Sequence, residues 1–108
     1  MLGLNIGYHV ESQFALAQDV DPNDARALFN KGTDLDQLGK YDEAISYYDK
    51  ALAIDSNDIV ALFYKGLALA DLGKYEEAVT YYDKALAIQP NAPGIEAAKS
   101  EALAKLGK

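Results

Sequence analysis

The sequence contains few side chains that could carry out acid–base or metal chemistry. His9 is the only histidine, and no partner motif that would make it a general base stands near it. Asp19, Asp21 and Asp24 are close together, but the glycine and the terminal glutamate of a calcium-binding loop are missing. Cysteine is absent, which excludes disulfides, thiolate metal sites and a cysteine nucleophile. We therefore expect that the chain is not an enzyme and that it uses no cofactor and no metal.

Length and composition fit a single folded domain. The chain has 108 residues, of which 50% are hydrophobic, enough to form a packed core. The net charge of −7 argues against nucleic acid or an anionic membrane as a partner, because both bind basic surfaces. No apolar run approaches the roughly 18 residues that span a bilayer. We expect a cytoplasmic protein with no nucleic-acid or membrane partner.

An internal repeat determines the architecture. Residues 27–57 align with residues 61–91 at an offset of 34 residues, and the segments 47–54 and 81–88 are identical, YYDKALAI. Self-similarity at a period of this length indicates a solenoid in which each repeat is one supersecondary unit.

Each repeat is predicted to be a pair of helices joined by a tight turn. The first helices are expected over residues 23–38 and 57–72, because their leucines recur at multiples of a helical turn. Gly39 and Gly73 should end these helices in the left-handed conformation. The second helices are expected over 41–54 and 75–88. The predicted buried positions are Leu28, Leu35, Leu38, Ala44, Tyr48, Ala51 and Leu52 in the first repeat, and Leu62, Leu69, Leu72, Ala78, Tyr82, Ala85 and Leu86 in the second.

Two glycines lie in the middle of predicted helices. Glycine costs up to about 1 kcal/mol relative to alanine at such a position. Because Gly32 and Gly66 recur at the repeat offset, we expect them to allow a close approach of two helices. The expected residues facing them are Ala44 and Ala78.

The linkers between helices are short and similar, and they predict further helices at both ends. They read DPND at 21–24, DSND at 55–58 and QPNA at 89–92. Proline ends a helix, and asparagine or aspartate caps the next one. The expected domain spans residues 1–108 and has six helices. It consists of an N-terminal half repeat (8–20), two repeats (25–58 and 59–92) and a C-terminal capping helix (93–108).

This pattern resembles the tetratricopeptide repeat (TPR) family. The resemblance implies an all-α fold, a right-handed α–α superhelix. Three departures stand out: a leucine replaces the tryptophan of the first helix, a lysine precedes the glycine instead of leucine, and Ser56 replaces a proline. The matching residues are Leu28, Gly32, Leu35, Ala44, Tyr48 and Ala51, and then Leu62, Gly66, Leu69, Ala78, Tyr82, Ala85 and Pro90.

The resemblance also implies a concave groove, lined by the first helices, that holds a peptide or a partner helix. We expect at least two of Phe29, Phe63, Tyr64 and Leu67 to form an exposed apolar contact strip there. Carried onto this sequence, the ligand groove consists of Arg26, Phe29, Asn30, Thr33, Phe63, Tyr64, Leu67 and Glu101. The same helix faces carry Asp36, Gln37, Asp71, Ala97 and Lys105.

Some members of the family grip the acidic C-terminus of heat-shock chaperones with a clamp of lysines, asparagines and an arginine. At the matching positions this chain has Phe29, Thr33, Tyr64, Gly94 and Ala98. The clamp residues are therefore missing, and we expect no binding of a chaperone tail by that mechanism.

Three functions are compatible with the sequence. The leading one is a scaffold that binds a protein or peptide in the groove. The second is a homo-oligomerising assembly element, because two full repeats are fewer than the usual minimum of about three. Its contacts would be Val10 and Phe14 at one end, Ile95 and Leu106 at the other, or the groove itself. The third is a regulatory fragment of a larger TPR-containing protein.

Overall fold

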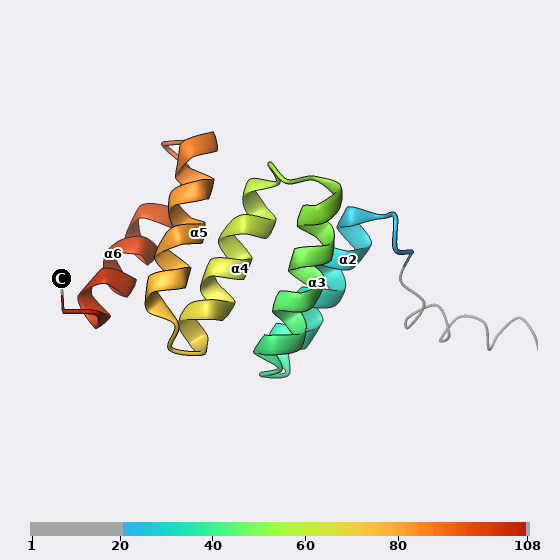
Figure 1. The fold of residues 1–108 in the computed structure, drawn as a ribbon, viewed down its shortest axis with the longest axis horizontal. Helices are drawn as coiled ribbons and strands as arrows, with labels where there is room; N and C mark the ends of the chain where they lie inside the picture. The colour runs from blue at the N-terminus through green and yellow to red at the C-terminus, as the bar shows by residue number, and fades with distance from the viewer. Residues whose placement is uncertain (1–20, 108) are drawn as a thin grey trace, which may run out of the picture.

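The computed structural model describes residues 21–107, and this part of the chain consists of helices and short connections. The helices lie side by side in chain order, and no strand is found among them (Figure 1). The all-α class is therefore confirmed. The predicted helix over residues 8–20 lies outside the described residues, so the structure shows five of the six expected helices. They are α2 (Ala25–Gln37), α3 (Tyr41–Ile54), α4 (Ile59–Asp71), α5 (Tyr75–Ile88) and α6 (Ile95–Lys105).

Local capping sets where these helices begin and end. Asp24 and Asp58 each accept two backbone N–H groups of the following first turn, so α2 and α4 begin two residues later than predicted. Gly39 and Gly73 follow these helices with φ of 78° and 81°, a conformation that glycine adopts without strain. The second helices, α3 and α5, have the predicted bounds.

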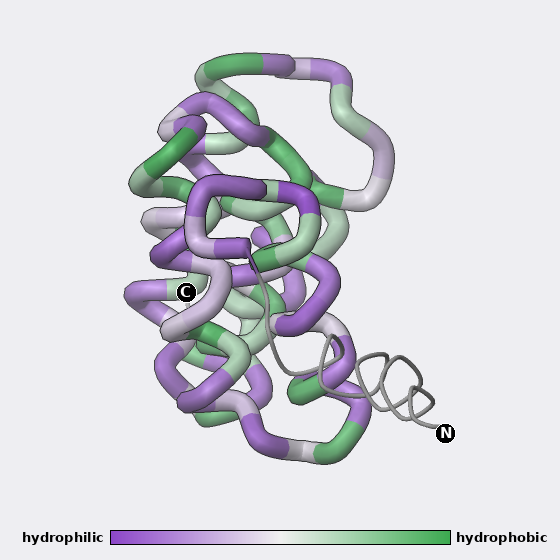
Figure 2. Tube along the Cα trace, turned by 90° about the vertical axis from the view of Figure 1, so that its right-hand side faces the viewer, coloured by the Kyte–Doolittle hydropathy of each residue, from purple (hydrophilic) through white to green (hydrophobic). Residues whose placement is uncertain are grey.

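The helices pack as hairpins that stack on one another. α2 packs against α3 and α4 against α5, while α3 contacts α4 and α5 contacts α6. Hydrophobic and hydrophilic segments alternate along the tube, as expected for helices with one apolar and one polar side (Figure 2). Each hairpin thus buries its apolar side against its own partner helix and the next hairpin.

The closest packing in each hairpin is between a tyrosine ring and a glycine. A Cβ added at Gly32 would lie 2.5 Å from Cε1 of Tyr48, and one at Gly66 would lie 2.5 Å from Cε1 of Tyr82. The two tyrosines are 0% and 1% exposed, as predicted for core residues. At Gly32 the three atoms nearest to the added Cβ all belong to the ring of Tyr48, one turn further along α3 than the expected Ala44.

At the second glycine, the backbone oxygen of Ala78 lies 3.3 Å from the added Cβ at Gly66, so Ala78 faces Gly66 as predicted. Four predicted core leucines lie nearer the surface than expected. Leu38 is 69% exposed, because α2 has ended and this residue is its C-cap. The other three, Leu52, Leu72 and Leu86, are partly buried.

Replacing Gly32 by alanine should destabilise the fold. In an open helix this change would stabilise by up to about 1 kcal/mol. Here the new methyl group would overlap the Tyr48 ring, and we expect a loss of about 1–3 kcal/mol in the free energy of unfolding. Urea unfolding followed by circular dichroism measures the difference. The control Ser46→Ala, at an exposed position of α3, should change stability by no more than about 0.5 kcal/mol. A Gly32→Ala variant as stable as the wild type would show that the ring can move aside.

Candidate functional site

The first helices of the hairpins, α2, α4 and α6, are neighbours: α2 contacts α4, and α4 contacts α6. We call their shared solvent-facing side the groove face. Most of the predicted ligand residues border one of three cavities on this face.

The first cavity has a volume of about 420 Å³ and lies between α2 and α4. It brings together three predicted residues, Arg26, Phe29 and Asn30, with Asp58 and Val60. Val60 was not predicted, although it is 47% exposed. It occupies the repeat position of Arg26, so the offset of 34 residues could have identified it.

The second cavity, of about 180 Å³, lies on the other side of Val60 and contains the predicted Phe63. Its remaining walls come from the start of α4 and from the loop before α6. They are Ile59, Gln89, Ala92, Pro93 and Ile95.

An aromatic layer connects the core to the groove face. The Phe29 and Tyr64 rings meet edge to face, with centroids 5.1 Å apart, and the Phe63 and Tyr64 rings do so at 6.0 Å. Behind them, Tyr48 lies 5.5 Å from Phe29 and Tyr82 lies 5.9 Å from Phe63. Tyr64 is 36% exposed, whereas Phe29 and Phe63 are partly buried.

The third cavity, of about 190 Å³, lies between the C-terminal half of α4 and α6. It brings the predicted Leu67 and Glu101 together with Asp71, Tyr82 and Lys105. Burial and then the charges of Asp71 and Glu101 raise the pKa of Tyr82 to about 12. Two carboxylates and one ammonium group thus line this end of the groove face.

The first repeat places a different polar pair at the corresponding site. The Tyr48 hydroxyl donates to Oδ2 of Asp36 at 2.5 Å. Burial and the charge of Asp71 raise the pKa of Asp36, although the hydrogen bond from Tyr48 opposes the shift. Ala70 stands at the equivalent position of the second repeat, so Tyr82 lacks this acceptor.

Two predicted residues border none of these cavities. The Thr33 hydroxyl donates to the backbone carbonyl of Asn30 at 2.8 Å, within α2. Tyr64 instead presents its ring between Phe29 and Phe63. The eight predicted residues thus share one face but do not form one cavity.

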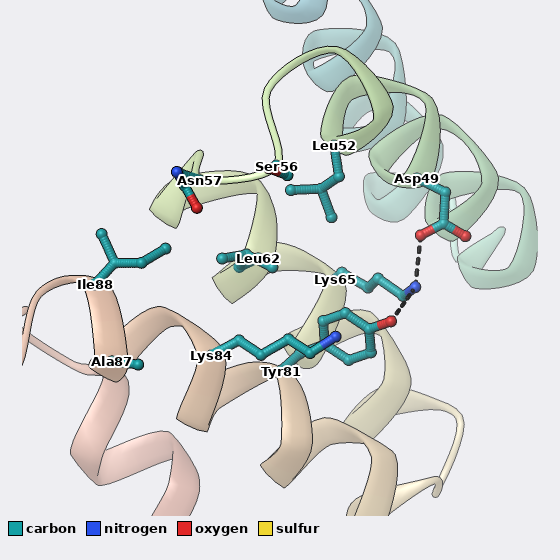
Figure 3. Close-up of a pocket in the computed structure, with 10 residues that line it drawn as sticks. All are labelled: Asp49, Leu52, Ser56, Asn57, Leu62, Lys65, Tyr81, Lys84, Ala87 and Ile88. Atoms are coloured by element: carbon teal, nitrogen blue, oxygen red, sulfur yellow. Dashed lines mark hydrogen bonds and ion pairs between the residues drawn. The ribbon is translucent and has the colours of Figure 1, made fainter.

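A larger cavity, of about 470 Å³, lies between α3 and α5 and was not predicted. Figure 3 shows Lys65 reaching between Asp49 and Tyr81 in this cavity. The lysine donates to Asp49 Oδ1 at 2.5 Å and to the Tyr81 hydroxyl at 2.9 Å. Burial lowers the pKa of Lys65, but these two partners outweigh burial and raise it overall. The sequence signal was the lysine at a position where the family has leucine.

Within residues 21–107, no group of three or more histidine or carboxylate side chains gathers in a way that could hold a metal ion. None of the described helices combines the length and apolar character needed to cross a membrane.

The TPR family model, described as "Tetratricopeptide repeat", matches residues 25–58 and 59–92. The chain belongs to the tetratricopeptide repeat family. Among curated proteins, none matches this sequence.

Several solved structures share the fold. The first TPR of Spaghetti (RPAP3), bound to the HSP90 peptide SRMEEVD, is 26% identical with a TM-score of 0.79, over 83% of this chain and 71% of that chain. The second TPR of the same protein, bound to the same peptide, is 24% identical with a TM-score of 0.75, over 86% of this chain and 84% of that chain. A MamA structure is 22% identical with a TM-score of 0.81, and the match covers 94% of this chain but only 57% of MamA.

Alkaline pH should destabilise this TPR fold partly through Tyr82. Its pKa is raised from 10.0 to about 12, so the phenol ionises in the unfolded chain before it does in the folded one. The stabilisation of the folded state that depends on the neutral Tyr82 phenol is fully present below pH 10 and is lost as the pH rises to about 12. Between pH 10 and about 12, the free energy of unfolding should therefore decrease less in Tyr82→Phe than in the wild type. We expect the two decreases to differ by on the order of 2 kcal/mol.

The measurement is urea unfolding of both chains at several pH values. The comparison at pH 7, where the phenol is neutral in both states, isolates the loss of the hydroxyl itself. Equal pH dependence in the two chains would contradict the assignment.

Proposed function

We propose that this TPR chain is a non-enzymatic scaffold that binds a peptide or a helix of a partner protein on its groove face. The observation that carries the proposal is the exposed apolar surface around Val60 and Tyr64, which are 47% and 36% exposed. Val60 separates two cavities, and the Phe29–Tyr64–Phe63 layer lies beside them. A soluble protein seldom leaves such a surface uncovered without a use for it.

Family membership supports a protein or peptide as the partner. The two Spaghetti TPR domains in the comparison are bound to a peptide, and the same kind of ligand suits the groove face of this chain. Burying a large apolar side chain contributes on the order of 1.5–3 kcal/mol, so a few such contacts support micromolar binding. The predicted ligand residues Arg26, Phe29, Asn30, Thr33, Phe63, Tyr64, Leu67 and Glu101 belong to this proposal.

The proposal extends to the whole chain. We place residues 1–108 in one domain of a cytoplasmic protein, with no nucleic-acid or membrane partner. The net charge of −7 supports the absence of a nucleic-acid or membrane partner, because phosphate-rich partners require basic surface.

Self-association through α6 has less support than groove binding. Ile95, one of its expected contacts, is 2% exposed and is already buried within the chain. Glu96 and Ser100 occupy the repeat positions of Leu62 and Gly66. Since a Cβ at Gly66 would lie 2.5 Å from an aromatic ring, a serine there prevents a second helix from packing in the same way.

The first test removes exposed apolar surface from the groove face. The variant Val60→Gln/Tyr64→Gln changes two residues at the surface, so the partly buried Phe29 and Phe63 keep supporting the core. We expect quantitative pull-down from native lysate to lose up to about 90% of each groove-bound partner for a loss of about 1.4 kcal/mol, which weakens binding tenfold.

The matched control is Ile54→Gln/Ile88→Gln, which removes two isoleucines of similar exposure, 46% and 44%, from the ends of α3 and α5. It should retain the partners. The groove proposal is wrong if both folded variants retain the same partners or if the control loses them as well.

A second test concerns the acidic peptide SRMEEVD. The residues at the clamp positions are apolar or uncharged, and the face also carries Asp71 and Glu101. We expect fluorescence anisotropy to detect no binding of the labelled peptide at about 100 µM protein, which corresponds to less than about 5.5 kcal/mol of binding free energy. Saturable binding at lower protein concentration would show that the chain holds an acidic tail without the clamp.

A further inference from the structure

The third cavity of the groove face combines apolar walls with a polar end. Aliphatic and aromatic side chains of α4, α5 and α6 make up most of its lining, and two carboxylates and one ammonium group complete it. The apolar members are Leu67, Ala70, Tyr75, Tyr82, Ala98 and Ala102.

The charges in this cavity do not balance. Asp71 and Glu101 contribute two carboxylates, and Lys105 contributes one ammonium group. Asp71 is the last residue of α4, and the last turn of that helix has no basic residue. The C-terminal end of a helix carries a partial negative charge, which adds to that of the aspartate. Asp36 of α2 is near enough to interact with Asp71, so the surroundings are negative as well.

Tyr82 also lines this cavity. The Tyr48 hydroxyl of the first repeat donates to Asp36, but the second repeat has Ala70 in place of that aspartate. The Tyr82 ring is 1% exposed, yet the residue lines the cavity. Its oxygen is therefore positioned to accept a hydrogen bond from a group that enters from the groove face.

We propose that this cavity is a pocket for one lysine or arginine side chain of the ligand that occupies the groove face. The inference rests on the proposed function. The methylene stem of such a side chain would lie against Leu67 and the alanines, as long basic side chains do when they cover apolar surface. Its charged head would meet Asp71, Glu101 and the Tyr82 oxygen. An acidic side chain would be repelled at the same place.

Synthetic peptides can test the pocket without knowledge of the natural ligand. The probes are short acetylated and amidated peptides with a fixed frame of leucine, phenylalanine and glutamine, in which a single lysine is moved through the positions. A matched set carries the uncharged isostere norleucine instead. We expect at least one lysine peptide to bind the full chain about fivefold or more tighter than its norleucine partner, as measured by fluorescence anisotropy.

Three variants locate the preference. Asp71→Asn/Glu101→Gln should lower the ratio of the two affinities to about one. Lys105→Met, which removes the competing ammonium group, should raise the ratio. Asp34→Asn/Glu96→Gln is the matched control, because it makes the same change in net charge at exposed residues that border none of the described cavities. It should keep the wild-type ratio.

The outcomes separate the pocket from the groove. If lysine and norleucine peptides bind equally at every position, or if the preference survives in Asp71→Asn/Glu101→Gln, the pocket assignment is wrong while groove binding stands. If the control loses the preference to the same extent, the attraction comes from net charge and the assignment is also wrong. If neither set binds, or if Val60→Gln/Tyr64→Gln leaves the binding of both sets unchanged, the groove proposal fails and the pocket fails with it.

Discussion

The contact between a tyrosine ring and a glycine backbone holds each hairpin together, and the rest of the structure depends on it. Tyr48 packs on Gly32 and Tyr82 on Gly66 so closely that a single methyl group would not fit. The ring thickness thereby sets the spacing between the two helices of a hairpin. Much of the remaining buried core is alanine, as at the fully buried Ala44. Small residues contribute little apolar area, so the two rings supply a large share of the burial that stabilises this short chain.

The same two tyrosine rings also pack against the aromatic side chains of the groove face. Tyr48 contacts both Phe29 and Tyr64, and Tyr82 contacts Phe63. The surface aromatics are thus supported from behind by side chains that have almost no freedom to move. Binding to a surface that is already ordered loses less conformational entropy than binding to mobile side chains. The contact that stabilises the hairpin therefore also prepares the apolar surface on which the proposed function depends.

The sequence predicted the helices well because their ends depend on local chemistry. Aspartate caps and left-handed glycines act on the neighbouring turn, so the predicted bounds of α2, α3, α4 and α5 lie within two residues of the observed ones. The sequence alone does not determine contacts that depend on the length of side chains from another helix. The residue facing Gly32 depends on which side chain of α3 is long enough to reach it.

The candidate site shows the same limit: the helical period placed its residues on one face, but the cavities that divide them depend on neighbouring helices. Lys65 was visible as a departure from the family, whereas its partner Asp49 belongs to the preceding repeat.

The two sides of the solenoid differ in what they can offer a ligand. Lys65 pairs with Asp49, and Lys99 pairs with Asp83 at 2.7 Å, so this inter-repeat ion pair recurs at the repeat offset. The cavity between α3 and α5 is the larger one, but its central lysine already binds a carboxylate and a hydroxyl. A ligand that entered there would have to replace these interactions, which help to join consecutive repeats. In the smaller cavity of the groove face, the carboxylates outnumber the basic group and the Tyr82 hydroxyl lacks the acceptor that Tyr48 has. The interactions that a ligand can gain, and not the volume of the cavity, thus favour the groove face as the binding surface.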